Sequence, residues 1–217
     1  MDGATRRQRL ETACLYLIVT LDAEHDAELA PVTTALTSGA IDLVQLRDVS
    51  GDRALRRRRA LALKTLCARH DTLLLLNDDP ELAAALDLDG AHVGREDAPP
   101  ATARAWLGPD RLLGTSTHDP QEVAEAHAQP VDHLGLGPCF PSDSKDLAYE
   151  PGGPALVQRC LAAAGALPLF PIGGITPANA PRLAAAGATR AAVGAGVLAA
   201  ADPAAAARAL RNALRGE

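Results

Sequence analysis

The sequence predicts an α/β protein with one domain, a single (β/α)8 barrel of the TIM type that spans residues 1–217. Eight short apolar runs recur along the chain, and stretches rich in Ala, Leu, Arg and Glu with helical spacing separate them. The apolar runs hardly alternate with polar residues, which is typical of parallel strands buried on both faces. No linker or change of composition divides the chain, and its length lies near the lower end for such a barrel.

The strands are expected at eight places in chain order, with helices between them. The strands are predicted over Leu15–Val19, Ile41–Leu46, Leu73–Leu76, Gly90–Val93, Arg111–Gly114, His133–Gly137, Leu169–Ile172 and Ala191–Val193. Helices are predicted over Ala54–His70, Pro80–Leu86, Gln121–Ala128, Ala155–Ala164, Asn179–Ala186 and Ala199–Leu214. Residues 1–12 are expected to be an N-terminal extension or a short helix. Four helix starts carry a capping residue before a proline: Asp79-Pro80, Asp119-Pro120, Thr176-Pro177 and Asp202-Pro203.

Composition narrows the kinds of partner that the protein can have. Lys and Arg number 21 and Asp and Glu number 27, so the net charge is 21 − 27 = −6. A chain with this charge is a poor candidate for binding nucleic acid or an anionic membrane. We therefore expect small-molecule partners, with any anion held locally by backbone amides, a few cations or a metal. The sequence leaves the oligomeric state open, with a homo-oligomer as one option.

The cysteines and the N-terminus indicate a cytoplasmic protein. The chain has four cysteines, without a CxxC pair or the His/Cys spacing of a zinc site. Reduced thiols in the cytoplasm fit this pattern better than a disulfide framework. No apolar run approaches the length of a membrane span, and the segment Met1–Glu11 is too polar for a signal peptide.

Chemistry in a (β/α)8 barrel takes place at the C-terminal ends of the strands, so the polar residues after each apolar run are the candidates for the site. Because these ends all meet at one mouth, we favour a functional interpretation over ordinary loop polarity. The candidates are Gln45, Arg47, Asp48, Asn77, Asp78, Glu96, Asp97, Ser116, His118, Ser142–Lys145, Gly173-Gly174 and Gly194–Gly196.

Two carboxylates from neighbouring strands predict a Mg²⁺ site. Asp78 and Asp97 are hard oxygen ligands, and two such ligands leave room for water and phosphate oxygens. Asp79 is expected to cap the helix that begins at Pro80, which leaves Asp78 to face the mouth. Glu96 competes with Asp97, and position alone does not choose between them.

Three loops have the residues that phosphate groups need. The loop Gly137–Lys145 ends in hydroxyls and a lysine, which suit a diphosphate, although a solvated loop explains it equally well. Gly173-Gly174 and Gly194-Ala195-Gly196 follow the seventh and eighth strands, where barrels commonly bind a phosphate through backbone N–H groups. The mouth is therefore expected to hold phosphorylated small molecules.

Taken in order, these motifs resemble the thiamine-phosphate synthase family over roughly residues 15–214. The matching pieces are Gln45-Leu46-Arg47-Asp48, Asn77-Asp78, Gly90–Asp97, Gly114–His118, the Gly137–Lys145 loop and Gly173-Gly174-Ile175. The family couples hydroxymethylpyrimidine diphosphate to a thiazole phosphate, with help from Mg²⁺, and releases pyrophosphate. The resemblance thus implies a transferase that makes thiamine phosphate.

The resemblance also implies a role for individual residues. Asp78 and Asp97 would be the Mg²⁺ ligands. The pyrimidine diphosphate would be held by Gln45, Arg47, Asn77, Ser116 and Lys145, of which Lys145, Ser116 and Arg47 are the expected catalytic residues. The thiazole phosphate would be held by Ser142, Asp143, Ser144, Gly174, Gly194 and Ala195.

The chain departs from the family pattern at two positions. Val49 stands where the family usually has a lysine, so the diphosphate loses one cationic contact, and Ala195 stands where a serine is frequent. Arg47 or a residue of 53–59 could compensate, although the run Arg56–Arg59 is read as a solvated helix face. Two alternatives therefore stay open, a thiazole tautomerase-like isomerase and a barrel that binds ligands without turnover.

Overall fold

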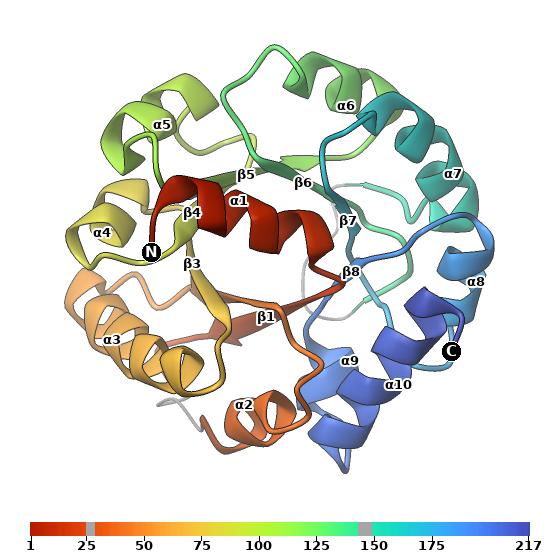
Figure 1. The fold of residues 1–217 in the computed structure, drawn as a ribbon, viewed down its shortest axis with the longest axis horizontal. Helices are drawn as coiled ribbons and strands as arrows, with labels where there is room; N and C mark the ends of the chain where they lie inside the picture. Colours follow the sequence, from red (N-terminus) through yellow and green to blue (C-terminus); the bar gives the residue numbers. More distant parts are fainter. Residues whose placement is uncertain (25–28, 143–148) are drawn as a thin grey trace.

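Eight parallel strands form the centre of the computed structural model, which describes residues 1–24, 29–142 and 149–217. Their order in the sheet is β7-β6-β5-β4-β3-β2-β1-β8, and β7 and β8 lie side by side, so the sheet is a nearly closed barrel (Figure 1). This confirms the predicted fold class, and each strand overlaps its predicted range. The strands are β1 (Leu15–Leu21), β2 (Leu43–Asp48), β3 (Leu73–Asn77), β4 (Gly90–Val93), β5 (Leu112–Thr117), β6 (His133–Leu136), β7 (Leu169–Pro171) and β8 (Ala191–Val193).

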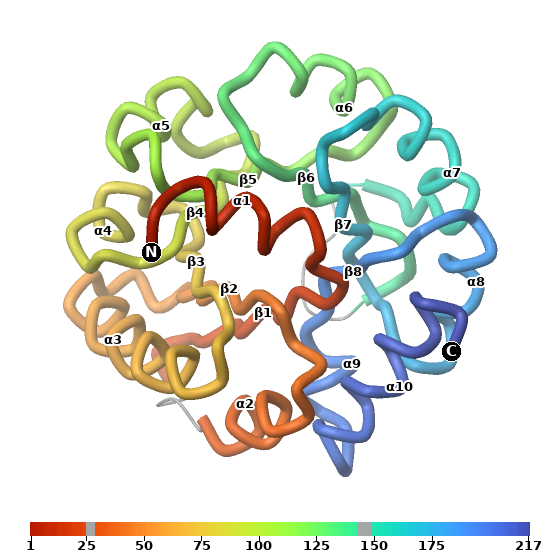
Figure 2. The backbone as a smooth tube through the Cα atoms, viewed as in Figure 1, coloured from red at the N-terminus to blue at the C-terminus, as the bar shows by residue number. Residues whose placement is uncertain are grey.

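Helices form an outer ring around the strands. Along most of its length, the chain alternates between a central strand and an outer helix (Figure 2). No helix in the described part of the chain is long and apolar enough to span a membrane. The helices are α1 (Gly3–Thr12), α2 (Leu29–Leu36), α3 (Arg53–Arg69), α4 (Pro80–Ala85), α5 (Pro100–Leu107), α6 (Pro120–Ala126), α7 (Gly153–Ala164), α8 (Ala180–Ala185), α9 (Ala195–Leu198) and α10 (Pro203–Arg215).

The predicted helix starts are confirmed at three of the four capping residues, whose side chains accept backbone N–H groups of the first turn: Asp79, Asp119 and Asp202. The fourth prediction, at Thr176, is wrong, because α8 begins at Ala180. The Asn179 side chain accepts from the Thr176 N–H at 2.9 Å and donates to the Gly174 carbonyl at 2.8 Å. These two bonds fold the segment back as a turn before the helix begins.

Buried apolar side chains form two layers. One lies inside the barrel and includes Tyr16, Leu43, Leu75, Leu112 and Phe170. The larger one fills the space between the strands and the outer helices. Leu, Val, Ile and Ala make up most of both layers.

Within the predicted N-terminal segment 1–12, α1 is the helix that closes the N-terminal end of the barrel. The guanidinium of Arg6 lies 3.1 Å from the Asp89 carboxylate, and that of Arg7 lies 2.8 Å from Asp132. Both aspartates come directly before a strand, so α1 covers the end of the barrel where strands begin. This is the end that faces the viewer in Figure 1, where α1 crosses the centre in red. The mouth with the candidate residues lies at the opposite end.

Candidate active site

A chain of hydrogen bonds crosses the barrel interior just below the mouth. The Tyr16 hydroxyl donates to Gln45 Oε1 at 2.5 Å, and Gln45 Nε2 donates to Asn77 Oδ1 at 2.6 Å. Burial raises the pKa of the Tyr16 phenol, which therefore stays neutral and able to donate. Because Asn77 Oδ1 already accepts from Gln45, the Asn77 amide nitrogen remains available to donate to a ligand in the mouth.

Sequence reasoning missed Tyr16 and grouped Gln45 with the polar residues that end the second strand; Gln45 lies within β2 and is buried. The period of two along β1 and β2 would have found both, because alternate residues of a strand face the same side. Tyr16 of β1 pairs with Leu43 of β2, and both side chains lie inside the barrel. Gln45 comes two residues after Leu43, so its side chain faces the same interior.

Asp78 and Asp97 meet at the mouth as the sequence predicts. Asp78 directly follows β3 in a left-handed conformation with φ of 64°, and its N–H donates to the His92 carbonyl at 2.9 Å. Asp97 Oδ2 accepts from the Gly94 N–H at 2.7 Å, which turns the carboxylate back over the end of β4. The two carboxyl groups share a hydrogen bond. The neighbouring Glu96 is exposed, so the geometry favours Asp97 as the partner of Asp78.

The protonation of Asp78 reflects this pairing. Asp78 as a whole residue is exposed, yet partial loss of water around its carboxyl group raises the pKa. The hydrogen bond and the negative charge of Asp97 raise it further, and the nearby cations of Arg47 and Arg56 only partly oppose them. The resulting pKa is about 7. Two neighbouring carboxylates repel each other, and a bound cation would relieve that repulsion. A raised carboxyl pKa of this kind is therefore typical of a pair that binds a cation.

The donor set suits Mg²⁺ better than a transition metal. Within residues 1–24, 29–142 and 149–217, no group of three or more His, Cys, Asp or Glu side chains comes together as a metal cage. Mg²⁺ is commonly held by one or two carboxylates, with water and substrate phosphates at its other positions. The Asp78–Asp97 pair fits that arrangement.

Arg47 and Ser116 lie at the mouth on β2 and β5. Arg47 is partly buried at the end of β2 and makes no hydrogen bond or ion pair with any described residue. The Ser116 hydroxyl lies 3.1 Å from His92 Nε2. Below them, burial lowers the pKa of His133 to about 3, so that imidazole is neutral and cannot serve as a base at ordinary pH.

The loops after β6, β7 and β8 lie against one another. The Phe140 N–H donates to the Gly173 carbonyl at 3.0 Å, which ties the β6 loop to the β7 loop. A Cβ on Gly174, whose φ is 59°, would lie 2.2 Å from the Pro141 carbonyl oxygen, and one on Gly196 would lie 2.1 Å from that of Ile175. Only glycine permits these approaches, which bring the three loops together.

Four of the residues predicted for the thiazole phosphate lie in these three loops: Ser142, Gly174, Gly194 and Ala195. Ser142 is half-buried directly after Pro141, and Gly194 precedes the short helix α9, whose first N–H groups have no helical acceptor. The predicted residues Asp143, Ser144 and Lys145 lie outside the described residues.

His118 is engaged at the rim of the mouth. Its Nδ1 lies 3.0 Å from Glu122 Oε2, and its ring stacks on Tyr149 at a centroid distance of 3.8 Å. The other oxygen of Glu122 lies 2.7 Å from Arg95 Nη1. These contacts support a structural role for His118.

The arginine run on α3 is not uniformly solvated, so that interpretation is wrong for two of its four members. Arg57 and Arg58 are exposed. Arg59 is buried, with Nη1 2.9 Å from Asp48 Oδ2 and Nη2 donating to the Asp22 carbonyl at 2.7 Å. Arg56, three residues earlier on the same face, lies over the ends of β2 and β3. A run of like residues gives no sign of which ones face inward.

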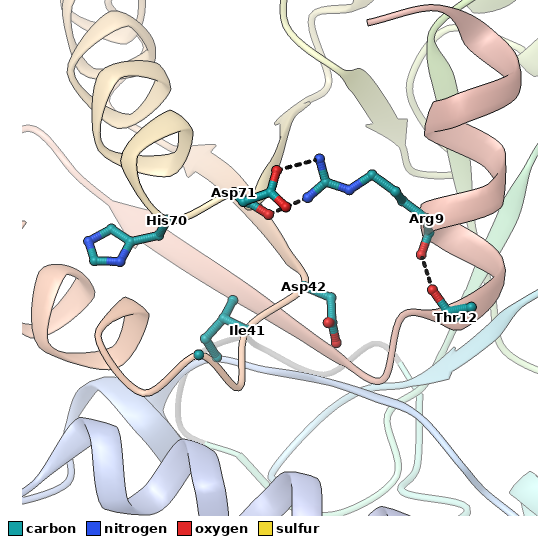
Figure 3. A pocket seen from close by; sticks show the side chains of 7 residues that line it. Arg9, Thr12, Ile41, Asp42, His70 and Asp71 are labelled. Atoms are coloured by element: carbon teal, nitrogen blue, oxygen red, sulfur yellow. Dashed lines mark hydrogen bonds and ion pairs between the residues drawn. The ribbon is translucent and has the colours of Figure 1, made fainter.

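A polar pocket at the N-terminal end is a different feature from the mouth. Figure 3 shows Arg9 of α1 reaching Asp71, with Thr12 and Asp42 also at the pocket; Asp42 and Asp71 come before β2 and β3. Arg9 is paired with Asp71 at 3.0 Å, and Asp42 accepts from the N–H groups that begin β1. The charged residues of this pocket therefore hold α1 against the N-terminal end of the barrel.

The raised pKa of Asp78 predicts a stabilising substitution. Since folding raises this pKa from 3.8 to about 7, stability falls as pH rises through that range. Asp78→Asn removes the charge, and asparagine tolerates positive φ. At pH 8 in a chelator, we expect its Tm to exceed that of the wild type by about 2–5 °C after allowance for solvent screening.

The control for this measurement is Asp78→Ala, which also removes the charge but is strained at a φ of 64° and should gain less. The gain of Asp78→Asn should shrink at pH 5, where the wild-type carboxyl is protonated. An Asp78→Asn variant that melts no higher than the wild type at pH 8 would disprove the repulsion between Asp78 and Asp97.

Fold and site together define a (β/α)8 barrel of the class that binds phosphorylated small molecules at its C-terminal mouth. Residues 15–197 match the family model of thiamine monophosphate synthase. The chain is 40% identical to a thiamine-phosphate synthase of Mycobacterium sp. (strain KMS), over 94% of each chain. The chain therefore belongs to the thiamine monophosphate synthase family.

Other relatives agree in part. A thiamine-phosphate synthase of Synechococcus sp. (strain CC9605) is 44% identical over 88% of this chain, but over 53% of its own length. The chain thus spans about half the length of several curated relatives that it matches. The solved structure of a thiamine phosphate pyrophosphorylase from Pyrococcus furiosus has a TM-score of 0.82 at 28% identity, with 96% of this chain and 98% of that chain covered.

Proposed function

We propose that this protein is a thiamine-phosphate synthase. In this reaction the bond between the pyrimidine methylene carbon and the diphosphate oxygen breaks, and pyrophosphate leaves with the electron pair. The thiazole nitrogen then forms a bond to the methylene carbon, which gives thiamine phosphate. No proton has to be removed from either substrate, which agrees with a mouth whose described histidines are paired or neutral.

One observation carries the proposal: a carboxylate pair and a set of glycine-lined loops lie at the same mouth. The carboxylates of Asp78 and Asp97 lie at the ends of β3 and β4, and the close approach at Gly174 lies at the end of β7. A reaction that joins a diphosphate to a monophosphate needs two anion sites of different kinds. An isomerase that acts on the thiazole phosphate alone would need only the second.

The diphosphate end of the mouth would be formed by Asp78, Asp97, Arg47 and Lys145. Mg²⁺ held by the two aspartates would neutralise the diphosphate and favour the departure of pyrophosphate. Arg47 has its guanidinium donors available for phosphate oxygens, since it makes no hydrogen bond or ion pair with the described residues. Catalysis in this proposal is positioning and stabilisation of the charge on the leaving group.

The organic parts of the substrates would be held by the remaining residues. Gln45, Asn77 and Ser116 line the interior below the diphosphate end, where an amide or hydroxyl can meet the ring nitrogens and amino group of a pyrimidine. Ser142, Gly174, Gly194 and Ala195 would hold the thiazole phosphate, together with Asp143 and Ser144. Backbone N–H groups would supply the contact that the side chain at Ala195 lacks.

An omission experiment tests the proposal. The protein with Mg²⁺ receives the pyrimidine diphosphate alone, the thiazole phosphate alone, or both, and pyrophosphate is measured. We expect multiple turnovers of pyrophosphate release only with both substrates, and little without Mg²⁺. Turnover of a thiazole phosphate alone would instead support the tautomerase-like activity. Binding of both substrates without any release would support a barrel that binds ligands without turnover.

We also propose the cytoplasm as the location, because the cysteines Cys14, Cys67, Cys139 and Cys160 are all free and buried. Homo-oligomerisation stays a prediction that measurement of the mass in solution would test.

A further inference from the structure

Arg56 faces the mouth from the outer ring of helices. On α3 the exposed arginines Arg57 and Arg58 point away from the barrel, whereas 20% of the Arg56 side chain is exposed. Its Nη2 lies 3.5 Å from the Asp48 carbonyl oxygen and its Nη1 lies 3.5 Å from Asp79 Oδ2. Asp48 ends β2 and Asp79 comes just after β3, so the Arg56 guanidinium lies above two neighbouring strand ends.

The contacts of Arg56 leave most of its hydrogen-bonding capacity unused. Its Nε is buried and has no hydrogen-bond partner among the described residues. The contact with the Asp48 carbonyl is at the limit of hydrogen-bond length, and the contact with Asp79 is longer than a normal hydrogen bond. A guanidinium carries five N–H donors, and withdrawing them from water without acceptors is unfavourable.

Asp79 is not the partner that explains this arginine. Asp79 Oδ2 already accepts from Arg53 Nε at 3.0 Å, and Asp79 Oδ1 accepts from the Leu82 N–H at 2.9 Å as the cap of α4. Arg53 is thus the ion-pair partner of Asp79, and the cap would form without Arg56. The position of Arg56 at the mouth calls for another anionic acceptor.

The charges around the mouth indicate what that acceptor is. The cations of Arg47 and Arg56 both act on Asp78 at the end of β3, where each lowers the pKa of its carboxyl. The two guanidiniums therefore flank the carboxylate pair from β2 and from α3. An anion placed against Asp78 and Asp97 through a divalent cation would meet both of them.

We propose that Arg56 is a diphosphate-binding residue that, with Arg47, holds the leaving pyrophosphate. Arg56 then supplies the cationic contact that is absent at Val49, whose side chain is 50% exposed at the end of β2 and carries no charge. A planar guanidinium suits this role because it can donate two parallel hydrogen bonds to phosphate oxygens. The proposal rests on the proposed function for the identity of the diphosphate.

The test is the binding of inorganic pyrophosphate with Mg²⁺, measured by calorimetry on the whole protein without turnover. We expect Arg56→Gln to weaken this binding by about tenfold to a hundredfold, because a charged hydrogen bond is lost. Arg57→Gln, one residue away on the exposed side of α3, should stay within about twofold of the wild type. Thermal melting of both variants checks that they are folded.

A rescue variant separates a lost contact from a disturbed helix. Val49→Lys in the Arg56→Gln background returns a cation to the end of β2, and we expect it to recover much of the pyrophosphate affinity. Turnover gives a second readout, in which Arg56→Gln raises the KM for the pyrimidine diphosphate and leaves the KM for the thiazole phosphate unchanged. Equal pyrophosphate affinities of Arg56→Gln and the wild type would overturn the proposal.

The same measurements distinguish this inference from the proposed function. If the wild type binds pyrophosphate and Arg56→Gln does not, while no thiamine phosphate forms, the role of Arg56 stands and the synthase activity fails. If the wild type makes thiamine phosphate and Arg56→Gln binds pyrophosphate normally, only the role of Arg56 fails. A wild type that binds no pyrophosphate with Mg²⁺ would overturn both.

Discussion

Asp97→Asn is expected to lower the Mg²⁺-dependent formation of thiamine phosphate by at least about a hundredfold, with the fold intact. The amide keeps an oxygen that can accept from the Gly94 N–H, but it no longer offers a charged metal ligand beside Asp78. A more weakly held Mg²⁺ would stabilise the leaving pyrophosphate less, and loss of one such electrostatic contact commonly lowers kcat by about 10²–10³-fold.

Glu96→Gln is the matched control for Asp97→Asn. Glu96 is the adjacent carboxylate, is exposed and lies in the same loop, so its loss should change turnover by less than about twofold. Turnover is measured at saturating substrates across a Mg²⁺ titration, with the Tm of each variant. Full activity of Asp97→Asn would show that the metal assignment is wrong, and loss of activity in Glu96→Gln would move the ligand to Glu96.

Arg59→Leu is expected to lower the free energy of unfolding by about 3–5 kcal/mol, because it leaves a buried carboxylate without its cation. The side chain of Asp48 is 0% exposed and that of Arg59 is 3% exposed, and the pair is closed at 2.9 Å. The Asp48 pKa is lowered: burial acts to raise it, but the hydrogen bonds from Ser50 and Arg59 outweigh that effect.

Chemical denaturation at pH 7 measures this loss, and Arg58→Leu on the exposed side of α3 serves as the control, expected within about 0.5 kcal/mol of the wild type. Adding Asp48→Asn to Arg59→Leu should recover part of the stability, since the uncompensated charge is gone. An Arg59→Leu variant as stable as Arg58→Leu would mean that the pair does not hold α3 against β2. Because Arg56 lies one turn away on the same helix, weaker pyrophosphate binding is expected to accompany the loss.

The sequence predicts the architecture well because its signals are local. Apolar runs of parallel-strand type mark all eight strands, and the Asp-Pro pairs fix the starts of α4, α6 and α10. The short α9 (Ala195–Leu198) was not predicted as a helix, and the C-terminal helix was predicted over Ala199–Leu214, whereas α10 begins at Pro203. The alanine-rich composition there does not mark the short α9, whereas Asp202-Pro203 marks the start of α10.

The closed end of the barrel was the least predictable part of the fold. Asp42, Asp89 and Asp132 each come just before an even-numbered strand and accept backbone N–H groups of the neighbouring strand. Two of them also bind arginines of α1. Each aspartate looks like an ordinary loop residue in the sequence, since its partners are far away along the chain.

The candidate site was predictable where one residue follows a strand directly. Asp78 and Asp97 come together as expected, and the hydrogen bond from the Gly94 N–H orients Asp97, which position alone did not show. Tyr16 was missed, and Arg56 was read as part of a solvated helix face, because the place of each depends on how a strand or helix is rotated. Rotation is set by packing against distant residues, which one sequence does not display.

The most direct test of the central claim is the identification of the product by mass spectrometry. The protein is incubated with Mg²⁺, hydroxymethylpyrimidine diphosphate and a thiazole phosphate, and the organic product and pyrophosphate are quantified over many turnovers. Our account predicts thiamine phosphate and pyrophosphate in equal amounts, with neither formed when Mg²⁺ is chelated. Absence of thiamine phosphate at every Mg²⁺ concentration, in a protein that is folded by thermal melting, would contradict it.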